Sequence, residues 1–241
     1  MKHTLARRMV AEFIGTLFLL AAVVGSGIMG ERLAAGNVAL ALLANTIATG
    51  AALIAIILAF GPISGAHLNP VVTLADAWMG GIAWRETPGY LLAQMAGAFA
   101  GVVTAHWMFG LSVVSASTHV RSGPAQLFSE FIATFGLLAV IWGCVRHRPP
   151  AIPFAVGAYI TAAYWFTAST SFANPAVTVA RSMTNTFAGI RRHDTAGFIV
   201  AQFAGAFTAT WLFKWFIPTL GRDASAVLVE HDGELKPASD D

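Results

Sequence analysis

Two Asn-Pro pairs stand out in this chain as residues that could form a chemically active or binding site. They open two similar short segments, Leu68-Asn69-Pro70-Val71-Val72-Thr73 and Ala173-Asn174-Pro175-Ala176-Val177-Thr178. A side-chain amide donates hydrogen bonds to a neutral oxygen, but it has no proton to give or take in acid-base catalysis. One such pair would indicate only a capped helix start, whereas two matched pairs predict a shared site for a small polar solute. The residues of this predicted site are Asn69, Pro70, Val71, Asn174, Pro175 and Ala176.

Two carboxylates occupy equivalent places inside long apolar stretches, Glu12 in the first half of the chain and Glu130 in the second. A carboxylate within a membrane is a candidate functional group. We expect a structural role instead, in which both side chains accept hydrogen bonds from backbone N–H groups of the Asn-Pro segments. His67, two residues before Asn69, is likewise expected to support the structure and not to act as a gate.

The composition predicts that lipid surrounds the elements that carry these residues. Of 241 residues, 56% are hydrophobic and 11% are charged, against about 25% charged in soluble domains. About 20 apolar residues in a helix cross the hydrocarbon core, and lipid leaves no alternative partner for backbone polar groups. We therefore predict an all-α membrane protein with six transmembrane helices. The six stretches are 9–29, 38–60, 88–113, 126–145, 151–170 and 195–217.

The two halves of the chain resemble each other. Ala11-Glu12-Phe13-Ile14-Gly15-Thr16 recurs as Ser129-Glu130-Phe131-Ile132-Ala133-Thr134, and both the Asn-Pro segment and a Gln-x-Ala-Gly-Ala block recur in the same order. Halves of about 9–113 and 126–217 with three spans each must insert in opposite orientations, which gives an inverted repeat.

The Asn-Pro segments, about 68–79 and 173–183, are too short to cross a bilayer. Proline suits the first turn of a helix, so we predict two re-entrant half-helices that meet near the midplane. Their positively polarised starts would oppose cations and protons there.

Little else in the sequence suggests chemistry. The net charge of +2 does not favour nucleic acid, there is one cysteine, and no His/Cys cluster or phosphate-binding glycine loop is present. We expect no enzyme activity, no cofactor and no metal. An ion-coupled secondary transporter with broken helices remains an alternative from another class, but the spans lack the paired ionisable residues that it would need.

The predicted organisation is one channel domain, 9–217, between a short amino-terminal segment, 1–8, and an acidic tail, 218–241. Lys and Arg are more numerous at the span ends on the side of the termini, which favours a cytoplasmic location for both. The tail has the composition of a disordered segment.

The sequence resembles the major intrinsic protein family, the aquaporins and glycerol facilitators, through Ser64-Gly65-Ala66-His67-Leu68-Asn69-Pro70 and Asn174-Pro175-Ala176 over about residues 8–217. The resemblance implies a homotetramer with one pore per subunit, in the inner membrane of a bacterium. It also implies a filter at the outer side of the pore. The filter positions fall on Thr49, Ala162, Ser171 or alternatively Phe172, and Val177.

The filter departs from the family pattern at Val177, where most relatives have arginine. The expected set is small and weakly polar, so it predicts a wide filter. Together with the stretch that follows, Val177 makes the chain similar to bacterial aquaglyceroporins associated with arsenic resistance. The implied solutes are arsenite, methylated arsenicals, glycerol-like polyols and some water, and a water-selective aquaporin is the alternative. Arg181, one turn after Val177, is expected to be solvated at the outer mouth, and partial replacement of the missing arginine charge is the alternative.

Overall fold

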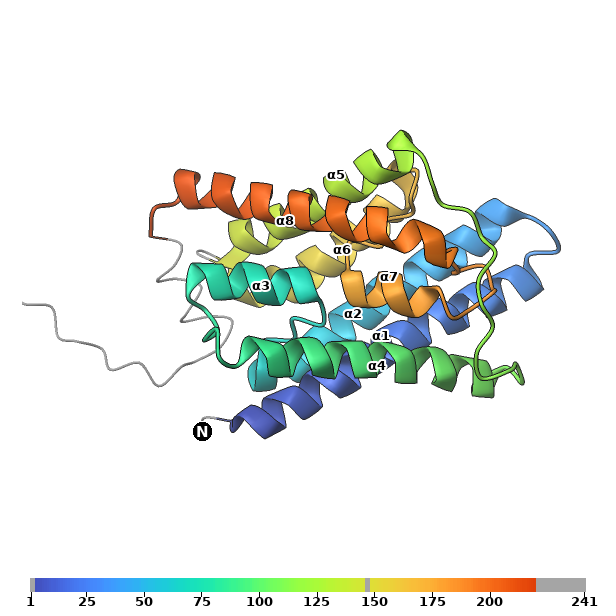
Figure 1. Ribbon diagram of the computed structural model, residues 1–241, viewed down its shortest axis with the longest axis horizontal. Helices are drawn as coiled ribbons and strands as arrows, with labels where there is room; N and C mark the ends of the chain where they lie inside the picture. The colour runs from blue at the N-terminus through green and yellow to red at the C-terminus, as the bar shows by residue number, and fades with distance from the viewer. Residues whose placement is uncertain (1–2, 146–147, 220–241) are drawn as a thin grey trace, which may run out of the picture.

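The computed structural model describes residues 3–145 and 148–219, and these residues form helices and connecting segments (Figure 1). The long helices are α1 (Leu5–Leu33), α2 (Val38–Ser64), α4 (Thr87–Met108), α5 (Pro124–Val145) and α8 (Thr195–Phe216). The shorter elements are α3 (Pro70–Met79), α6 (Ile152–Phe166), α7 (Pro175–Arg181) and the 3₁₀ turns η1 (Pro149–Ala151) and η2 (Arg192–Asp194). The prediction of an all-helical fold is confirmed for this part of the chain.

Five of these helices are long and apolar enough to cross a membrane. The fifth predicted span, 151–170, differs from expectation because its helix α6 has 15 residues, which corresponds to about 22 Å. Two prolines precede α6 in η1, and the backbone of Thr167 leaves the helix in an extended conformation. The remaining residues of this stretch lead into the second Asn-Pro segment.

The two halves pack in the same way. A Cβ on Gly97 of α4 would overlap the backbone oxygen of Phe13 in α1, and a Cβ on Gly205 of α8 would overlap that of Phe131 in α5. Glycine is therefore required at both crossings, because a side chain would force the helices apart. This equivalence gives the repeat found in the sequence a structural counterpart.

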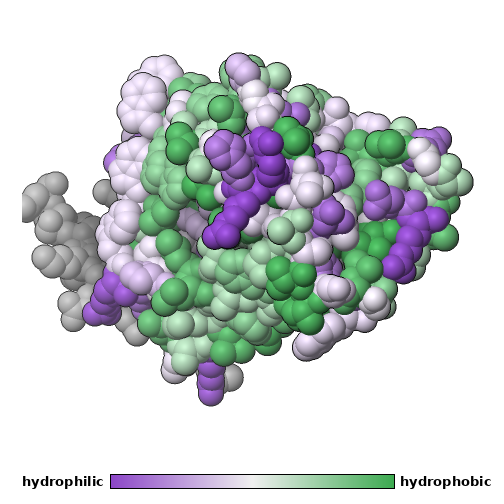
Figure 2. All heavy atoms as spheres, turned by 45° about the vertical axis from the view of Figure 1, so that its right-hand side comes forward, coloured by the Kyte–Doolittle hydropathy of each residue, from purple (hydrophilic) through white to green (hydrophobic). Residues whose placement is uncertain are grey.

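The outer surface is mostly hydrophobic. Large apolar side chains project outward from several long helices, among them Phe18, Leu92, Trp107, Val200 and Trp211. Figure 2 shows hydrophobic residues over the flanks and hydrophilic residues gathered towards the end that carries the loops at the right of Figure 1. An apolar flank between polar ends is the surface expected of a protein surrounded by lipid.

The first helix begins and the last helix ends at the same end of the bundle (Figure 1). The predicted acidic tail, 218–241, lies outside the described residues from position 220 onward. The predicted amino-terminal segment, 1–8, is described from residue 3, and α1 already begins within it at Leu5.

Candidate pore

The two Asn-Pro segments meet inside the bundle. Nδ2 of Asn69 donates to the carbonyl oxygen of Ala173 at 2.8 Å, and Nδ2 of Asn174 donates to that of Leu68 at 2.8 Å. Each asparagine therefore binds the backbone that precedes the other one. Because α3 and α7 begin immediately after these residues, their amino-terminal ends lie side by side (Figure 1).

Each asparagine is held in one orientation. Oδ1 of Asn69 accepts from Val71 N at 3.2 Å, and Oδ1 of Asn174 accepts from Ala176 N at 3.0 Å and Val177 N at 3.2 Å. A side-chain amide has two N–H donors, and the bond across the repeat uses one of them. Both asparagines line the central cavity, so the second N–H can serve a solute. The prolines, Val71 and Ala176 lie behind them, buried in the first turns of α3 and α7.

The segments that lead to the asparagines have an unusual backbone. Gly65, Ala66 and Leu68 have positive φ values in the first half, and Thr170, Ser171 and Ala173 have them in the second. For residues other than glycine this conformation costs about 1–2 kcal/mol each. Surrounding contacts must therefore hold these segments in place.

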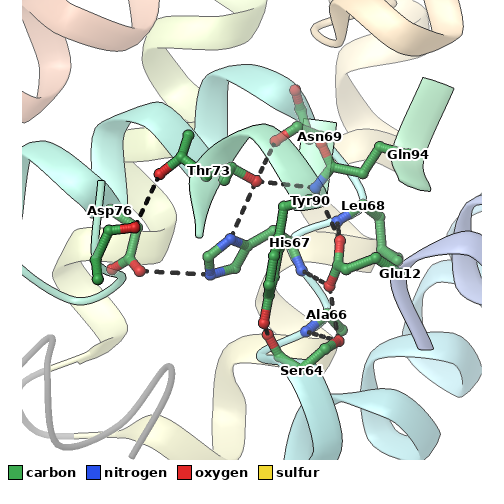
Figure 3. A network of polar contacts seen from close by, with 12 residues as sticks. Glu12, Ser64, Ala66, His67, Leu68, Asn69, Thr73, Asp76, Tyr90 and Gln94 are labelled. Carbon is green, nitrogen blue, oxygen red and sulfur yellow. Dashed lines mark hydrogen bonds and ion pairs between the residues drawn. The ribbon is translucent and has the colours of Figure 1, made fainter. Parts of the chain in front are cut away.

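Glu12 is the residue that holds the first segment (Figure 3). Its fully buried carboxylate accepts from Ser64 Oγ at 2.7 Å, His67 N at 2.9 Å, Leu68 N at 2.7 Å and Gln94 Nε2 at 2.8 Å. The bonded groups come from α2, the following segment and α4. A single carboxylate therefore connects the non-helical backbone to two long helices.

Glu130 is placed in the same way in the second half. Its buried carboxylate accepts from Phe172 N at 2.9 Å, Ala173 N at 2.9 Å and Gln202 Nε2 at 2.6 Å. Each glutamine also donates to a threonine of the adjoining half-helix, Gln94 to Thr73 and Gln202 to Thr178, at 2.8 Å in both cases. The carboxylates thus bind backbone and glutamine groups on the outer wall of the cavity.

These bonds also determine where the carbonyl groups point. In a planar trans peptide the C=O points opposite to the N–H. The N–H groups of His67 and Leu68 point at Glu12, and those of Phe172 and Ala173 point at Glu130. The carbonyl oxygens of the preceding residues therefore point away from the carboxylates, towards the cavity that these segments line.

His67 and Asp76 form a buried pair on the α3 side of the cavity (Figure 3). Nδ1 of His67 lies 3.1 Å from Thr73 Oγ1, and its Nε2 lies 3.5 Å from Oδ2 of Asp76. Asp76 is not among the site residues expected from the sequence. Its spacing of nine residues from His67, across a segment expected to start a helix, gave no indication that the two side chains would meet.

The central cavity has a volume of about 80 Å³. Since about 10–15 Å³ of such volume accommodates one water molecule, it has room for a short file of waters or for one small polyol. Its walls combine aliphatic side chains of α1, α2, α5 and α6 with the two Asn-Pro segments. No carboxylate is found among the described residues that line it.

Most of the expected filter residues lie at this cavity. Thr49, Ser171, Phe172 and Val177 all line it, so Ser171 and Phe172 both reach it. The expectation for Ala162 is wrong, because Ala162 is exposed on the outside of α6.

Tyr164 occupies the wall instead of Ala162. It lines the cavity, is buried, and its Oη lies 3.5 Å from Thr49 Oγ1. The wall therefore contains the aromatic rings of Tyr164 and Phe172, and it is bulkier than the small set predicted from the sequence.

Arg181 also differs from expectation. It is 2% exposed, lines the cavity and is not solvated at the outer mouth. Its guanidinium carbon lies 3.4 Å from the centre of the Phe172 ring, and its Nε donates to the backbone oxygen of Ala188. Residues that return after α7 therefore cover this side chain.

The loop between α4 and α5 is fixed over the outer part of this wall. Arg121 donates to the carbonyl oxygens of Gly189 at 2.8 Å and Ser169 at 3.1 Å, and its backbone N–H donates to Asp194 at 2.9 Å. Burial lowers the pKa of the Arg121 guanidinium. Burial alone would raise the pKa of Asp194, but the hydrogen bonds from Arg191 and Arg121 outweigh it and lower that pKa.

Comparisons with known proteins agree with this geometry. The family model described as "Major intrinsic protein" matches residues 1–149. "Aquaglyceroporin AqpS" of Rhizobium meliloti is 55% identical over 88% of this chain and 91% of its own length. "Aquaporin NIP1-4" of rice is 34% identical over 89% of this chain and 78% of its own length.

A solved structure has the same fold. The aquaglyceroporin from Plasmodium falciparum covers 90% of this chain and 99% of its own, with a TM-score of 0.71 at 20% identity. The fold is therefore that of an aquaglyceroporin, and the family predicted from the two Asn-Pro motifs is confirmed. This chain belongs to the major intrinsic protein family, and it is a multi-pass membrane channel for small solutes, not an enzyme.

Proposed function

We propose that the protein is a passive channel for small uncharged hydroxylated solutes, which excludes ions and protons. The solutes are arsenite in its neutral form, methylated arsenicals, glycerol-like polyols and some water. The observation that carries the proposal is the pair of asparagines at the cavity, each oriented by its own half-helix and by the opposite half.

The cavity wall suits a neutral molecule that is polar on one side. The asparagine N–H groups and the carbonyl oxygens of both entry segments supply donors and acceptors for hydroxyl groups, and the aliphatic and aromatic side chains suit a carbon backbone. A cation would lose its hydration shell here without gaining a carboxylate partner, which is costly in an apolar wall. The positively polarised starts of α3 and α7 oppose it further.

A water-selective channel is the second candidate. The rings of Tyr164 and Phe172 narrow the cavity more than Thr49, Ser171 and Val177 alone would. An ion-coupled transporter would need a buried ionisable group such as the His67–Asp76 pair, and a proton flux that depends on solute would support it. We further propose a homotetramer in a bacterial inner membrane with both termini in the cytoplasm, which native mass spectrometry and protease accessibility of tagged termini would test.

The solute can be tested with the full-length protein in proteoliposomes. Stopped-flow light scattering gives water and glycerol permeability, radiotracer or mass-spectrometric uptake gives arsenite permeability, and a pH-sensitive dye reports the proton leak. We expect glycerol and arsenite flux above that of protein-free vesicles, with no added proton leak. Fast water flow without glycerol flux would reject this proposal and favour the water-selective channel.

The variant Val177→Arg gives a matched comparison. A long side chain at a position that lines the cavity should reduce glycerol and arsenite flux more than water flux. An equal reduction of all three would place Val177 outside the constriction.

A further inference from the structure

We propose that Arg181 supplies the filter with the positive charge and the hydrogen-bond donors that Val177 lacks, and thereby determines both cation exclusion and the preference for hydroxylated solutes. The inference rests on the proposed function and assigns the selectivity of that pore to a residue of its outer wall.

The position of Arg181 on α7 makes this possible. Val177 and Arg181 are four residues apart in the same helix, so their side chains lie on the same face, one turn apart. Both line the cavity. An arginine side chain is long enough to extend back over one turn, and in this structure the guanidinium lies against the ring of Phe172, which belongs to the wall.

Two contacts hold the guanidinium at the cavity. Nε donates to the backbone oxygen of Ala188, and the face of Phe172 attracts the cation. A second guanidinium, that of Arg121, lies 5.1 Å from the centre of the same ring. Arg121 uses its own donors on backbone oxygens of the loops and does not line the cavity, so it packs behind the ring.

The remaining donors of Arg181 have no partner in the part of the chain that the structure describes. Its only hydrogen bond among the described residues is made by Nε. Its two Nη groups are not buried without a partner, so they remain accessible to a molecule in the cavity. It also forms no ion pair with a carboxylate of the described residues. A buried arginine usually has its donors paired, so free Nη groups at a cavity indicate that the solute accepts from them.

The charge itself acts on ions. The carboxylate of Glu130 accepts from Phe172 N, Ala173 N and Gln202. The positive charge of Arg181 is therefore uncompensated by any ion pair within the described chain, and in a narrow apolar passage it repels cations over the whole cross-section. A neutral solute meets no such barrier and gains donors for its hydroxyl groups.

The first experiment removes the charge and the donors by Arg181→Met. In proteoliposomes the proton and sodium leak should rise about tenfold. The ratio of glycerol to water permeability should fall by about 25-fold, because two hydrogen bonds are lost at about fivefold each. Arg181→Lys should keep the leak within about twofold of wild type, because it retains the charge, yet it should still lower the glycerol ratio.

Arg32→Met is the matched control. Arg32 also lies over an aromatic ring, 5.2 Å from the centre of Phe109, and donates to the backbone oxygen of that residue at 3.1 Å, but it is exposed and does not line the cavity. Arg32→Met should leave the proton and sodium leak and the ratio of glycerol to water permeability unchanged.

A second variant covers the case in which Arg181→Met fails to fold. Val177→Glu leaves Arg181 and its bond to Ala188 in place, and it pairs the guanidinium with a carboxylate four residues away. The cation leak should then rise as in Arg181→Met. Wild-type leak and wild-type glycerol ratio in the folded variants would overturn this inference, while the wild-type protein would still conduct glycerol and arsenite. Absence of flux in the wild type would instead reject the proposed function.

Discussion

Replacing Glu130 by glutamine removes one acceptor from a buried site in which all the surrounding groups are donors. The carboxylate accepts from Phe172 N, Ala173 N and Gln202 Nε2, and Glu130 is fully buried. A glutamine would have one oxygen for these three donors, and its amide group would face at least one N–H. The second entry segment, with its left-handed Ser171 and Ala173, would lose part of what holds it.

The magnitude follows from the bonds that are lost. A hydrogen bond to a charged group contributes about 1.5–3 kcal/mol, and an unsatisfied buried donor costs about 1–3 kcal/mol. We expect Glu130→Gln to lower the free energy of unfolding by about 3 kcal/mol. For a chain of this size that corresponds to a decrease in Tm of about 6–12 °C.

The assay is intrinsic tryptophan fluorescence of the purified protein during heating, combined with glycerol permeability of the same preparation. Glu12→Gln should behave similarly, because Glu12 accepts four bonds in the equivalent place. Glu31→Gln is the control, since Glu31 is exposed and should change Tm by less than about 1 °C. An unchanged Tm and an unchanged glycerol flux in Glu130→Gln would refute the reasoning that these carboxylates hold the pore wall.

Three further outcomes are expected. Gly205→Val should prevent folding, because the new side chain would overlap a backbone oxygen of α5. The measurement is the monodisperse yield in detergent. Gly61→Ala is the control and should be tolerated, because its Cβ meets no atom within 4 Å. Tyr164→Ala should raise glycerol flux by widening the cavity, and Ala162→Val, on the exposed side of α6, should leave it unchanged; equal effects in uptake assays would contradict the assignment of the wall. Because the pKa of Asp194 is lowered in the folded protein, its contribution to stability is complete above about pH 4 and is lost as the pH falls through its folded-state pKa. The Tm measured against pH should therefore decrease in acid less steeply for Asp194→Asn than for the wild type.

The fold could be predicted because its signals are local and repeated. Proline after asparagine marks the first turn of a helix, and the structure starts α3 at Pro70 and α7 at Pro175. The expected meeting of Asn69 and Asn174 followed from inversion of the two halves, and their side chains are bonded to the opposite segments. Hydrophobicity located the long helices but not all of their ends, since α1 runs over Leu5–Leu33 instead of 9–29 and α4 ends at Met108 instead of 113. The largest difference is α6, where Pro149 and the extended Thr167 shorten the helix.

The side of a helix that faces the cavity was harder to predict. Successive residues of a helix are about 100° apart, so an error of two residues turns a side chain to the opposite face. Ala162 and Tyr164 differ by such a two-residue step, so Ala162 is exposed whereas Tyr164 lines the cavity.

The position of Arg181 depended on a contact that is distant in the chain. Its spacing from Val177 showed the shared helix face, but its burial depends on Ala188, which returns over it after α7 ends. No local pattern predicts such a return.

The reciprocal bonds between the Asn-Pro segments have a consequence for biosynthesis. When the first half has left the ribosome, the carbonyl oxygen of Leu68 has no partner, because its donor is Asn174 in the half that is made later. In the same way, Nδ2 of Asn69 lacks its acceptor until Ala173 has been synthesised. The conduit therefore cannot mature in stages, and a truncated amino-terminal half inserted alone would expose unpaired backbone groups to lipid, which would make it a substrate for membrane quality-control proteases.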